Sequence, residues 1–186
     1  MKTLILNGSP KVNGDVAALV GEMTRHLHGE VRVLSHADGI SPCVDCRHCW
    51  TNDGCCLDDG MTEIYPYFSA CDNIVLASPI WFSALSGPLL NLAGRLLQCY
   101  FAAQHFRGVT PDIKPKNSVL ILCGAEAGTE KTPIATAHTI LKFMNARNRA
   151  ADIFSMDTNN IPAGEDAAAM NAVREAALLL NRLGGA

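Results

Sequence analysis

The chain has 186 residues, of which 48% are hydrophobic and 18% charged, and its formal net charge is −3. This composition excludes a disordered chain and predicts a single domain over residues 1–186 whose core needs no disulfides. The absence of a basic tract argues against nucleic acid as a partner. No apolar run reaches the roughly 18 residues that would cross a bilayer, so we expect no membrane insertion. The N-terminal segment lacks the pattern of a secretory signal, and we expect a cytoplasmic protein.

Short apolar runs alternate with helical patterns from the first residues to the last. The apolar runs predict strands at residues 3–8, 30–35, 73–78, 118–124 and 151–156. Apolar residues at helical spacing predict helices at residues 16–27, 61–71, 85–100, 132–147 and 164–185. Two long connections, 36–60 and 101–117, remain outside these elements, and connections of that length are usually functional.

The alternation of strands and helices predicts an α/β protein with a parallel sheet between helical layers. The first, third and fourth strands are apolar throughout and belong in the middle of the sheet, whereas the second and fifth alternate and belong at its edges. A three-layer flavodoxin-like fold, with a five-stranded parallel sheet in the order 2-1-3-4-5 and helices on both faces, satisfies this pattern. Its ligand crevice lies beyond the carboxyl ends of strands one and three.

Three loops leave the carboxyl ends of the central strands. The loop at residues 7–16 offers glycines, the hydroxyl of Ser9, the amide of Asn13 and a helix N-terminus, which together suit a phosphate, although an ordinary strand-to-helix turn explains them too. In the loop at residues 77–89, Trp81 and Phe82 can flank a planar ring, or else pack in the core or an interface. The third loop, residues 123–132, is rich in glycine and alanine and lets the backbone approach a flat ligand.

These segments resemble motifs of the NADPH-dependent FMN reductase family within the flavodoxin superfamily. Residues 8–16, GSPKVNGDV, are similar to its phosphate loop GSP-x-x-x-G-N-T, and residues 78–96, SPIWFSALSGPLLNLAGRL, are similar to its SP-I-Y-F-G-S segment. Residues 42–61, PCVDCRHCWTNDGCCLDDGM, resemble the cysteine stretch of its iron–sulfur flavoprotein branch. The resemblance covers the chain from about Leu4 to Gly128.

The resemblance implies an FMN-binding oxidoreductase that uses NADPH or NADH. It places the FMN phosphate at Ser9, Lys11, Asn13 and Gly14. It places the isoalloxazine ring between Pro79, Ile80, Trp81, Phe82, Ser83 and Ala84 on one side and Gly124, Ala125 and Gly128 on the other. The acceptor would be a small molecule such as a flavin, quinone or nitroaromatic compound, and the chain would form a homodimer or homotetramer.

One departure from the family pattern concerns the phosphate loop. Where the family has G-N-T, this chain has Gly14, Asp15 and Val16, so two hydrogen-bond donors are lost. A carboxylate is repelled by a phosphate but is favoured in the first turn of a helix. We therefore expect Asp15 to cap the helix and point away, and FMN to bind more weakly than in a member with the full loop.

Five of the eight cysteines crowd into residues 43–56 in the pattern C-x2-C-x2-C-x5-C followed by one more cysteine. A [4Fe-4S] cluster held by Cys43, Cys46, Cys49 and Cys55 is one explanation, because ferredoxin-type runs share the C-x2-C-x2-C core. A zinc site and a loop of reduced, unmetallated thiols are the alternatives. We read the remaining cysteines as packing residues: Cys71, Cys99 and Cys123.

Three functions follow from these patterns and stay open at this point. The first is an FMN-dependent NAD(P)H oxidoreductase, and the second is an iron–sulfur flavoprotein that carries electrons between FMN and a cluster. The third is a flavodoxin-like scaffold that has lost FMN. We expect the cysteine tract to border the open face of the flavin or the site of a neighbouring subunit, since the carboxyl ends of parallel strands lie at one edge.

Overall fold

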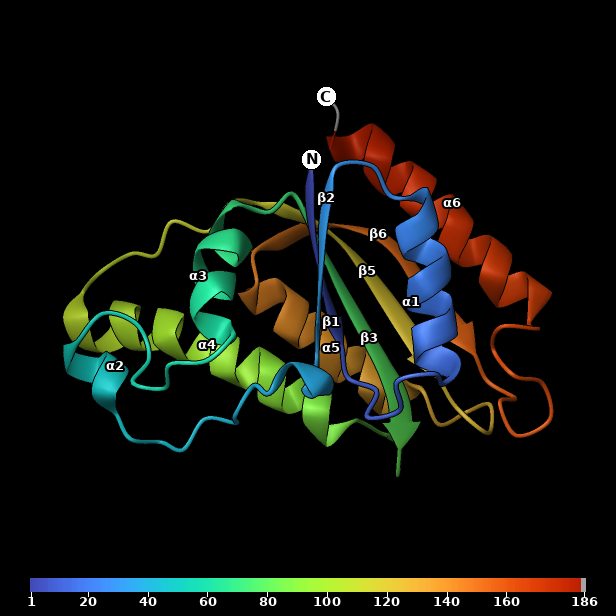
Figure 1. The fold of residues 1–186 in the computed structure, drawn as a ribbon, viewed down its shortest axis with the longest axis horizontal. Coiled ribbons are helices and arrows are strands. Elements are labelled where there is room, and N and C mark those ends of the chain that lie inside the picture. The colour runs from blue at the N-terminus through green and yellow to red at the C-terminus, as the bar shows by residue number, and fades with distance from the viewer. Residues whose placement is uncertain (185–186) are drawn as a thin grey trace.

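A computed structural model describes residues 1–184, and in it a parallel sheet lies between two layers of helices (Figure 1). The sheet runs in the order β2-β1-β3-β5-β6, and every neighbouring pair on this path is parallel. A further two-residue strand, β4, pairs antiparallel with the end of β3. The predicted order is therefore confirmed, with β5 and β6 as the fourth and fifth predicted strands. The strands of the described residues are β1 (Lys2–Asn7), β2 (Glu30–Ser35), β3 (Asn73–Trp81), β4 (Ala84–Leu85), β5 (Lys116–Cys123) and β6 (Ala146–Ser155).

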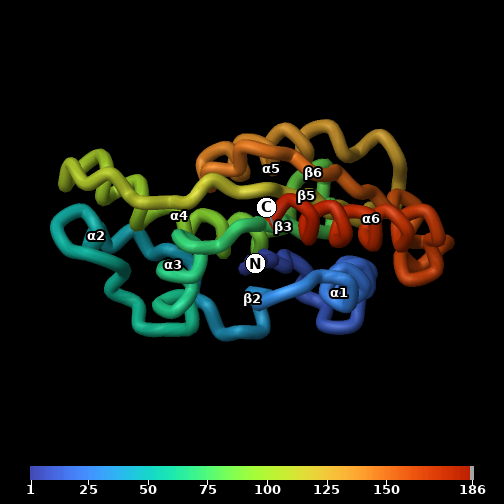
Figure 2. Tube along the Cα trace, turned by 90° about the horizontal axis from the view of Figure 1, so that it is seen from above, coloured from blue at the N-terminus to red at the C-terminus, as the bar shows by residue number. Residues whose placement is uncertain are grey.

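The helices cover both faces of the sheet, as Figure 2 shows, with α1 and α6 on one side and α3 and α4 on the other. Each face has its own apolar core, and the central strands contribute alternate side chains to the two cores. None of the helices within residues 1–184 has the length and apolar character to pass through a bilayer. The helices are α1 (Asp15–His26), the 3-10 turn η1 (His36–Asp38), α2 (His48–Thr51), α3 (Met61–Ala70), α4 (Gly87–Arg107), α5 (Lys131–Phe143) and α6 (Ala167–Gly184).

The last predicted strand begins at Ala146 instead of residue 151. Two predicted helix ends are also wrong, for identifiable reasons. The fourth predicted helix, α5, ends at Phe143 instead of residue 147, because Asn145 has a positive φ of 60° and turns the chain into β6. The third helix continues to Arg107, where Gly108 with a φ of 66° ends it, so the connection predicted at 101–117 is only about half as long. Residue 185, the predicted end of the last helix, lies outside the described residues.

Candidate functional site

The three predicted loops meet in a cleft of about 370 Å³ at the carboxyl ends of β1, β3 and β5. The structure places many of the predicted residues on its wall: Ser9, Lys11, Gly14, Pro79, Ile80, Trp81, Gly124 and Ala125. It adds residues that we had not assigned to FMN binding: Pro10, Asp15, Val16, Cys123 and Thr158. The other predicted residues lie on the same loops but are not part of the wall, and their contact with a ligand stays a prediction: Asn13, Phe82, Ser83, Ala84 and Gly128.

The first loop leaves the start of α1 open. The side chain of Asn7 accepts a hydrogen bond from the backbone N–H of Ser9 at 2.9 Å, and the Ser9 hydroxyl accepts one from Lys11 N–H at 3.2 Å. The loop is therefore held in shape by hydrogen bonds between its own residues. Helix α1 begins after Gly14, and no side chain caps it. The free N–H groups of its first turn and its positive dipole end therefore face the cleft, which suits an anion.

Asp15 does not cap α1, contrary to our expectation. Its carboxylate instead accepts a hydrogen bond at 2.9 Å from the backbone N–H of Ala163, in the connection that precedes α6. The contact fixes the carboxylate at the side of the cleft and joins the first turn of α1 to a segment about 150 residues away in sequence. Asp15 therefore stays on the wall of the cleft instead of pointing away from it as a cap.

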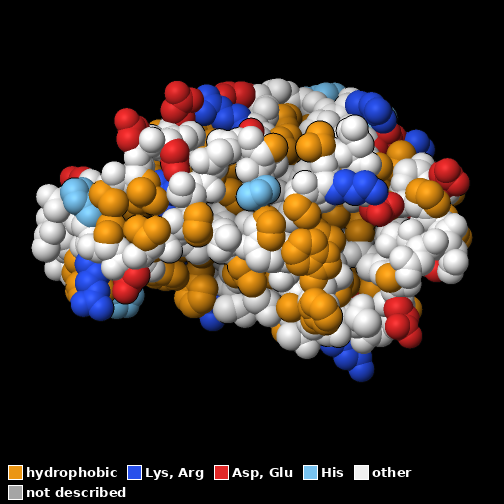
Figure 3. All heavy atoms as spheres, turned by 60° about the horizontal axis from the view of Figure 1, so that its bottom comes forward, with side chains coloured by type: hydrophobic (Ala, Val, Ile, Leu, Met, Phe, Trp, Pro, Cys, Tyr) orange, Lys and Arg blue, Asp and Glu red, His pale blue; other side chains and the backbone are white. Residues whose placement is uncertain are grey.

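The second loop is a tight hairpin instead of an irregular turn. Strand β3 continues to Trp81, and the turn to β4 consists of Phe82 and Ser83, which both have left-handed φ values of 50° and 55°. Trp81 lines the cleft and is 44% exposed, whereas Phe82 at the tip is completely exposed. Figure 3, which brings this end of the sheet forward, shows hydrophobic side chains gathered on the surface. Left-handed φ values at two residues other than glycine store strain that functional sites often carry.

Two buried serines join the first and second loops. Ser86 donates a hydrogen bond to the Gly8 carbonyl at 2.7 Å and caps α4 by accepting one from Leu89 N–H. Its own N–H donates to the hydroxyl of Ser78 at 3.0 Å. Gly8 has no room for a side chain, since a Cβ atom there would lie 2.4 Å from Leu89 Cβ. The two loops thus form one rigid wall, as a preorganised binding site requires.

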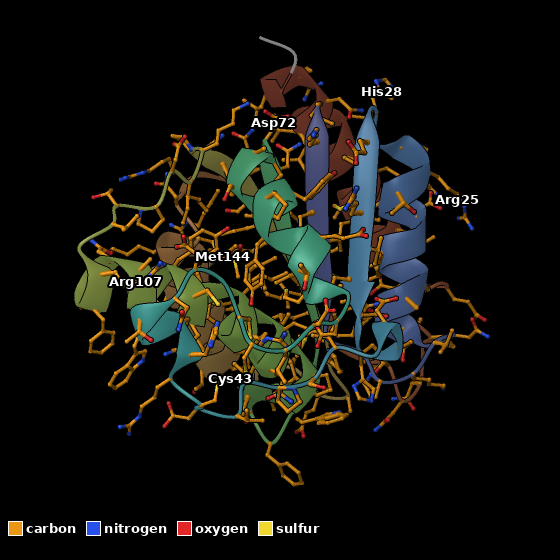
Figure 4. All side chains as sticks on the ribbon, turned by 60° about the vertical axis from the view of Figure 1, so that its left-hand side comes forward. Arg25, His28, Cys43, Asp72, Arg107 and Met144 are labelled. Atoms are coloured by element: carbon orange, nitrogen blue, oxygen red, sulfur yellow. The ribbon has the colours of Figure 1, made fainter. Side chains whose placement is uncertain are left out.

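A second, separate pocket contains six cysteines. The residues predicted as metal ligands, Cys43, Cys46, Cys49 and Cys55, line it together with Cys56 and Cys99. Figure 4 labels Cys43 on the loop beside α2 and α4. Cys99 lies on α4 and lines this pocket, so our reading of it as a packing residue alone is wrong. Cys71 and Cys123 are buried as predicted, although Cys123 also lies on the wall of the cleft. Cys99 was missed because nothing in its local sequence links a helix residue to a loop some fifty residues earlier.

The thiols of this pocket differ in their chemistry. A hydrogen bond from the backbone N–H of His48 holds the pKa of Cys46 below its ordinary value. Cys56 shares a hydrogen bond with Cys46 and has its pKa raised to about 11. Burial raises the pKa of Cys49, and it raises that of Cys99 to about 11. The pKa of Cys46 is thus lowered, whereas the pKa values of Cys49, Cys56 and Cys99 are raised.

A buried ion pair fixes both ends of the cysteine loop to α4. Arg95 is 1% exposed and pairs with Asp59 through both guanidinium NH₂ groups, at 3.0 and 3.1 Å. The same groups donate to the carbonyls of Ser41 and Leu57 at 2.6 and 3.2 Å. Burial would raise the pKa of Asp59, but the hydrogen bonds from Arg95 and from backbone N–H groups outweigh it and hold that pKa below its usual value. The Nε atom of Arg95 is buried without a hydrogen-bond partner.

The pocket suits an iron–sulfur cluster by its donors but not by its present size. Within residues 1–184, no three His, Cys, Asp or Glu side chains are arranged to hold a metal ion. Several thiols beside a guanidinium match the ligands and charge balance of a cluster. The free volume is about 20 Å³, room for about one water molecule, so the loop would have to open to admit a cluster.

The cleft and the cysteine pocket are distinct places on one chain. No residue within the described range lines both, and they lie on different parts of the fold, with α1 beside the cleft and α2 beside the cysteines (Figure 1). The expectation that the cysteine tract borders the flavin's open face therefore finds no support within a single chain. A contact with the site of a neighbouring subunit stays a prediction.

Comparisons with known proteins agree with this fold and these motifs. The family model described as NADPH-dependent FMN reductase matches residues 1–110. The chain is 31% identical over 99 residues to an iron-sulfur flavoprotein of Methanocaldococcus jannaschii, a match that covers 51% of each chain. It is 29% identical over 99 residues to an iron-sulfur flavoprotein of Methanosarcina thermophila, covering 51% of this chain and 52% of that protein. The matches thus span about half the length of these curated relatives.

Solved structures share the fold over nearly the whole chain. The NAD(P)H:quinone oxidoreductase from Methanothermobacter marburgensis superposes with a TM-score of 0.70 at 16% identity, covering 98% of this chain and 96% of that one. An FMN-dependent NADH-azoreductase from Bacillus anthracis, solved in complex with FMN, superposes with a TM-score of 0.62 at 13% identity, covering 98% and 99%. At these identities the likeness concerns the fold.

Proposed function

The chain belongs to the NADPH-dependent FMN reductase family, and from this premise we propose that it binds FMN in the cleft and acts as an NAD(P)H-dependent oxidoreductase. One observation carries the proposal: the uncapped first turn of α1 opens onto the same 370 Å³ cleft as Trp81 and the Gly124 loop. The volume lies within the roughly 300–1,000 Å³ of small-molecule sites. An anion-binding end beside an aromatic wall matches the phosphate and the ring of FMN.

In this proposal each loop has a definite task. The N–H groups at the start of α1, the Ser9 hydroxyl and Lys11 bind the phosphate, and Trp81 packs against the ring. Gly124 lines the cleft and packs against Met156, since a Cβ atom there would lie 2.8 Å from the Met156 methyl group. FMN held by these residues would supply the redox chemistry, namely hydride acceptance from reduced nicotinamide and electron transfer to a small-molecule acceptor.

The proposal includes a cytoplasmic location and assembly into a homodimer or homotetramer. All eight cysteines are free, as they would be in a reducing cytoplasm. A homodimer or homotetramer would cover the exposed hairpin tip at Phe82, which a single chain leaves in solvent. NADPH and NADH are both compatible with the cleft, and the proposal extends to either.

A matched pair of variants at the hairpin tests the proposal. Trp81→Ala removes an aromatic wall of the cleft, and we expect it to weaken FMN binding at least fivefold in a fluorescence titration. Phe82→Ala removes the neighbouring aromatic, which is completely exposed and does not line the cleft, and it should leave the affinity of a dilute, monomeric sample within about twofold. Far-ultraviolet circular dichroism checks that both variants keep the fold. Equal FMN affinity in Trp81→Ala and the unmodified chain would contradict the assignment of the cleft.

A second candidate function is that of an iron–sulfur flavoprotein, which transfers electrons between FMN and a [4Fe-4S] cluster. The observations that favour it are the clustered thiols of Cys43, Cys46, Cys49 and Cys55 and the names of the two curated relatives. Iron and acid-labile sulfide should then be retained after anaerobic expression with added iron. Their absence under those conditions leaves the reductase without a cluster as the function.

A further inference from the structure

Cys46 and Cys56 lie closer together than two independent thiols need to be. Their sulfur atoms are 3.1 Å apart, although the residues are ten positions apart in the sequence. A disulfide bond joins sulfurs at about 2.05 Å, so an approach of about 1 Å would suffice. Both residues are exposed to solvent, whereas Cys49, Cys71 and Cys123 are buried.

The backbone on either side of the pair is built to bring the two sulfurs together. Asp45 and Arg47, the direct neighbours of Cys46, both have left-handed φ values, 49° and 60°. Gly54, two residues before Cys56, has a φ of 75° and completes the return of the loop after α2. Two residues other than glycine in this conformation are costly and persist where the surroundings enforce them.

We propose that Cys46 and Cys56 form a reversible dithiol–disulfide centre that reacts with low-molecular-weight disulfides. In the first step one of the two sulfurs, as a thiolate, attacks the small disulfide R–S–S–R, forming a mixed disulfide and releasing R–S⁻. The other sulfur then attacks the mixed disulfide, closes the Cys46–Cys56 bond and releases the second R–S⁻. The two protons from the cysteines convert these products into two R–SH molecules, so the chain is oxidised by two electrons and the small disulfide is reduced.

The disulfide would also affect cluster binding. Cys46 is one of the four predicted cluster ligands, so a disulfide and a cluster would compete for the same sulfur. Arg95 and Asp59 anchor both ends of the loop independently of either sulfur. The disulfide can therefore close without release of the loop from α4.

Thiol mapping on the full chain tests the proposal. The reduced protein is incubated anaerobically with glutathione disulfide, free thiols are alkylated, and the protein is digested with trypsin without reduction. Cleavage after Arg47 separates residues 33–47, which contain Cys46, from residues 48–95, which contain Cys56. We expect two of the eight thiols to escape alkylation, the two peptides to be joined, and dithiothreitol to reverse the link.

Serine variants identify the sulfurs involved. Cys46→Ser and Cys56→Ser should each abolish the link between the peptides. The matched controls Cys43→Ser and Cys55→Ser, each a neighbour of one partner within the same peptides, should keep it. Alkylation of all eight cysteines after treatment, or a link that persists in Cys56→Ser, would overturn the proposal.

Discussion

Replacement of Arg95 by methionine should destabilise the protein far more than replacement of a typical surface arginine. Arg95 is 1% exposed, and its loss leaves the carboxylate of Asp59, itself only 15% exposed in its side chain, without its partner. The carbonyls of Ser41 and Leu57 lose their donors at the same time. Removing one partner of a buried ion pair costs about 3–5 kcal/mol, a large part of the roughly 5–15 kcal/mol by which a domain is stable.

Urea unfolding followed by circular dichroism measures this cost, and the same helix supplies a control. Arg107 on α4 is itself only 17% exposed, but its partner Asp53 is 94% exposed and stays hydrated without it, so Arg107→Met should cost about 1 kcal/mol or less. The double variant Arg95→Met with Asp59→Leu should recover much of the loss, because no buried charge is then left unpaired. If Arg95→Met costs no more than Arg107→Met, the guanidinium does not hold the cysteine loop and our account of the pocket fails.

Three further predictions concern the cleft, the acid stability and the cysteine tract. Asp15→Asn should strengthen FMN binding by about 1 kcal/mol, which is about fivefold in a fluorescence titration. The substitution removes a carboxylate from the cleft, and the asparagine can still accept the hydrogen bond from the Ala163 N–H. Unchanged or weaker binding would refute this. Hydrogen bonds, first from Arg174 and then from Arg25, lower the pKa of Glu22 from 4.5 to about 2. The contribution of Glu22 to the free energy of unfolding should therefore be complete above about pH 4.5 and be lost as the pH falls towards 2. Glu22→Gln should make the stability depend less on pH in this range, as measured by unfolding at a series of pH values. An unchanged pH dependence would exclude this role. For the iron–sulfur candidate, Cys43→Ser should abolish iron and sulfide incorporation while Cys55→Ser keeps part of it, because only Cys55 has a neighbouring replacement thiol; equal loss in both would contradict this.

The sheet could be predicted from the sequence because its central strands must be apolar on both faces. The runs at 3–8, 73–78 and 118–124 have no other stable place than the middle of a parallel sheet, and the structure places them there. The short strand β4 escaped notice since its turn, Phe82 and Ser83, has none of the glycine or asparagine typical of such hairpins. The end of α5 could have been found, because asparagine is the residue besides glycine that most readily adopts the left-handed conformation of Asn145.

The site was predictable in its loops but not in its long-range contacts. Loops that leave the carboxyl ends of adjacent parallel strands must meet, so the cleft followed from the strand order. The contact of Asp15 with Ala163 and the approach of Cys99 to the cysteine loop depend on how distant helices pack. No local spacing encodes such packing, and a helix residue such as Cys99 looks like any other core residue in the sequence.

The most direct test of the central claim is the visible absorption spectrum of the chain after FMN is added, followed by anaerobic addition of NADPH. The proposed function predicts that one FMN per chain stays bound through gel filtration and that its visible bands bleach on addition of NADPH or NADH. The claim would be contradicted if the chain elutes without flavin after incubation with excess FMN while its circular dichroism shows an intact fold. A flavodoxin-like scaffold that has lost FMN would then be the remaining explanation.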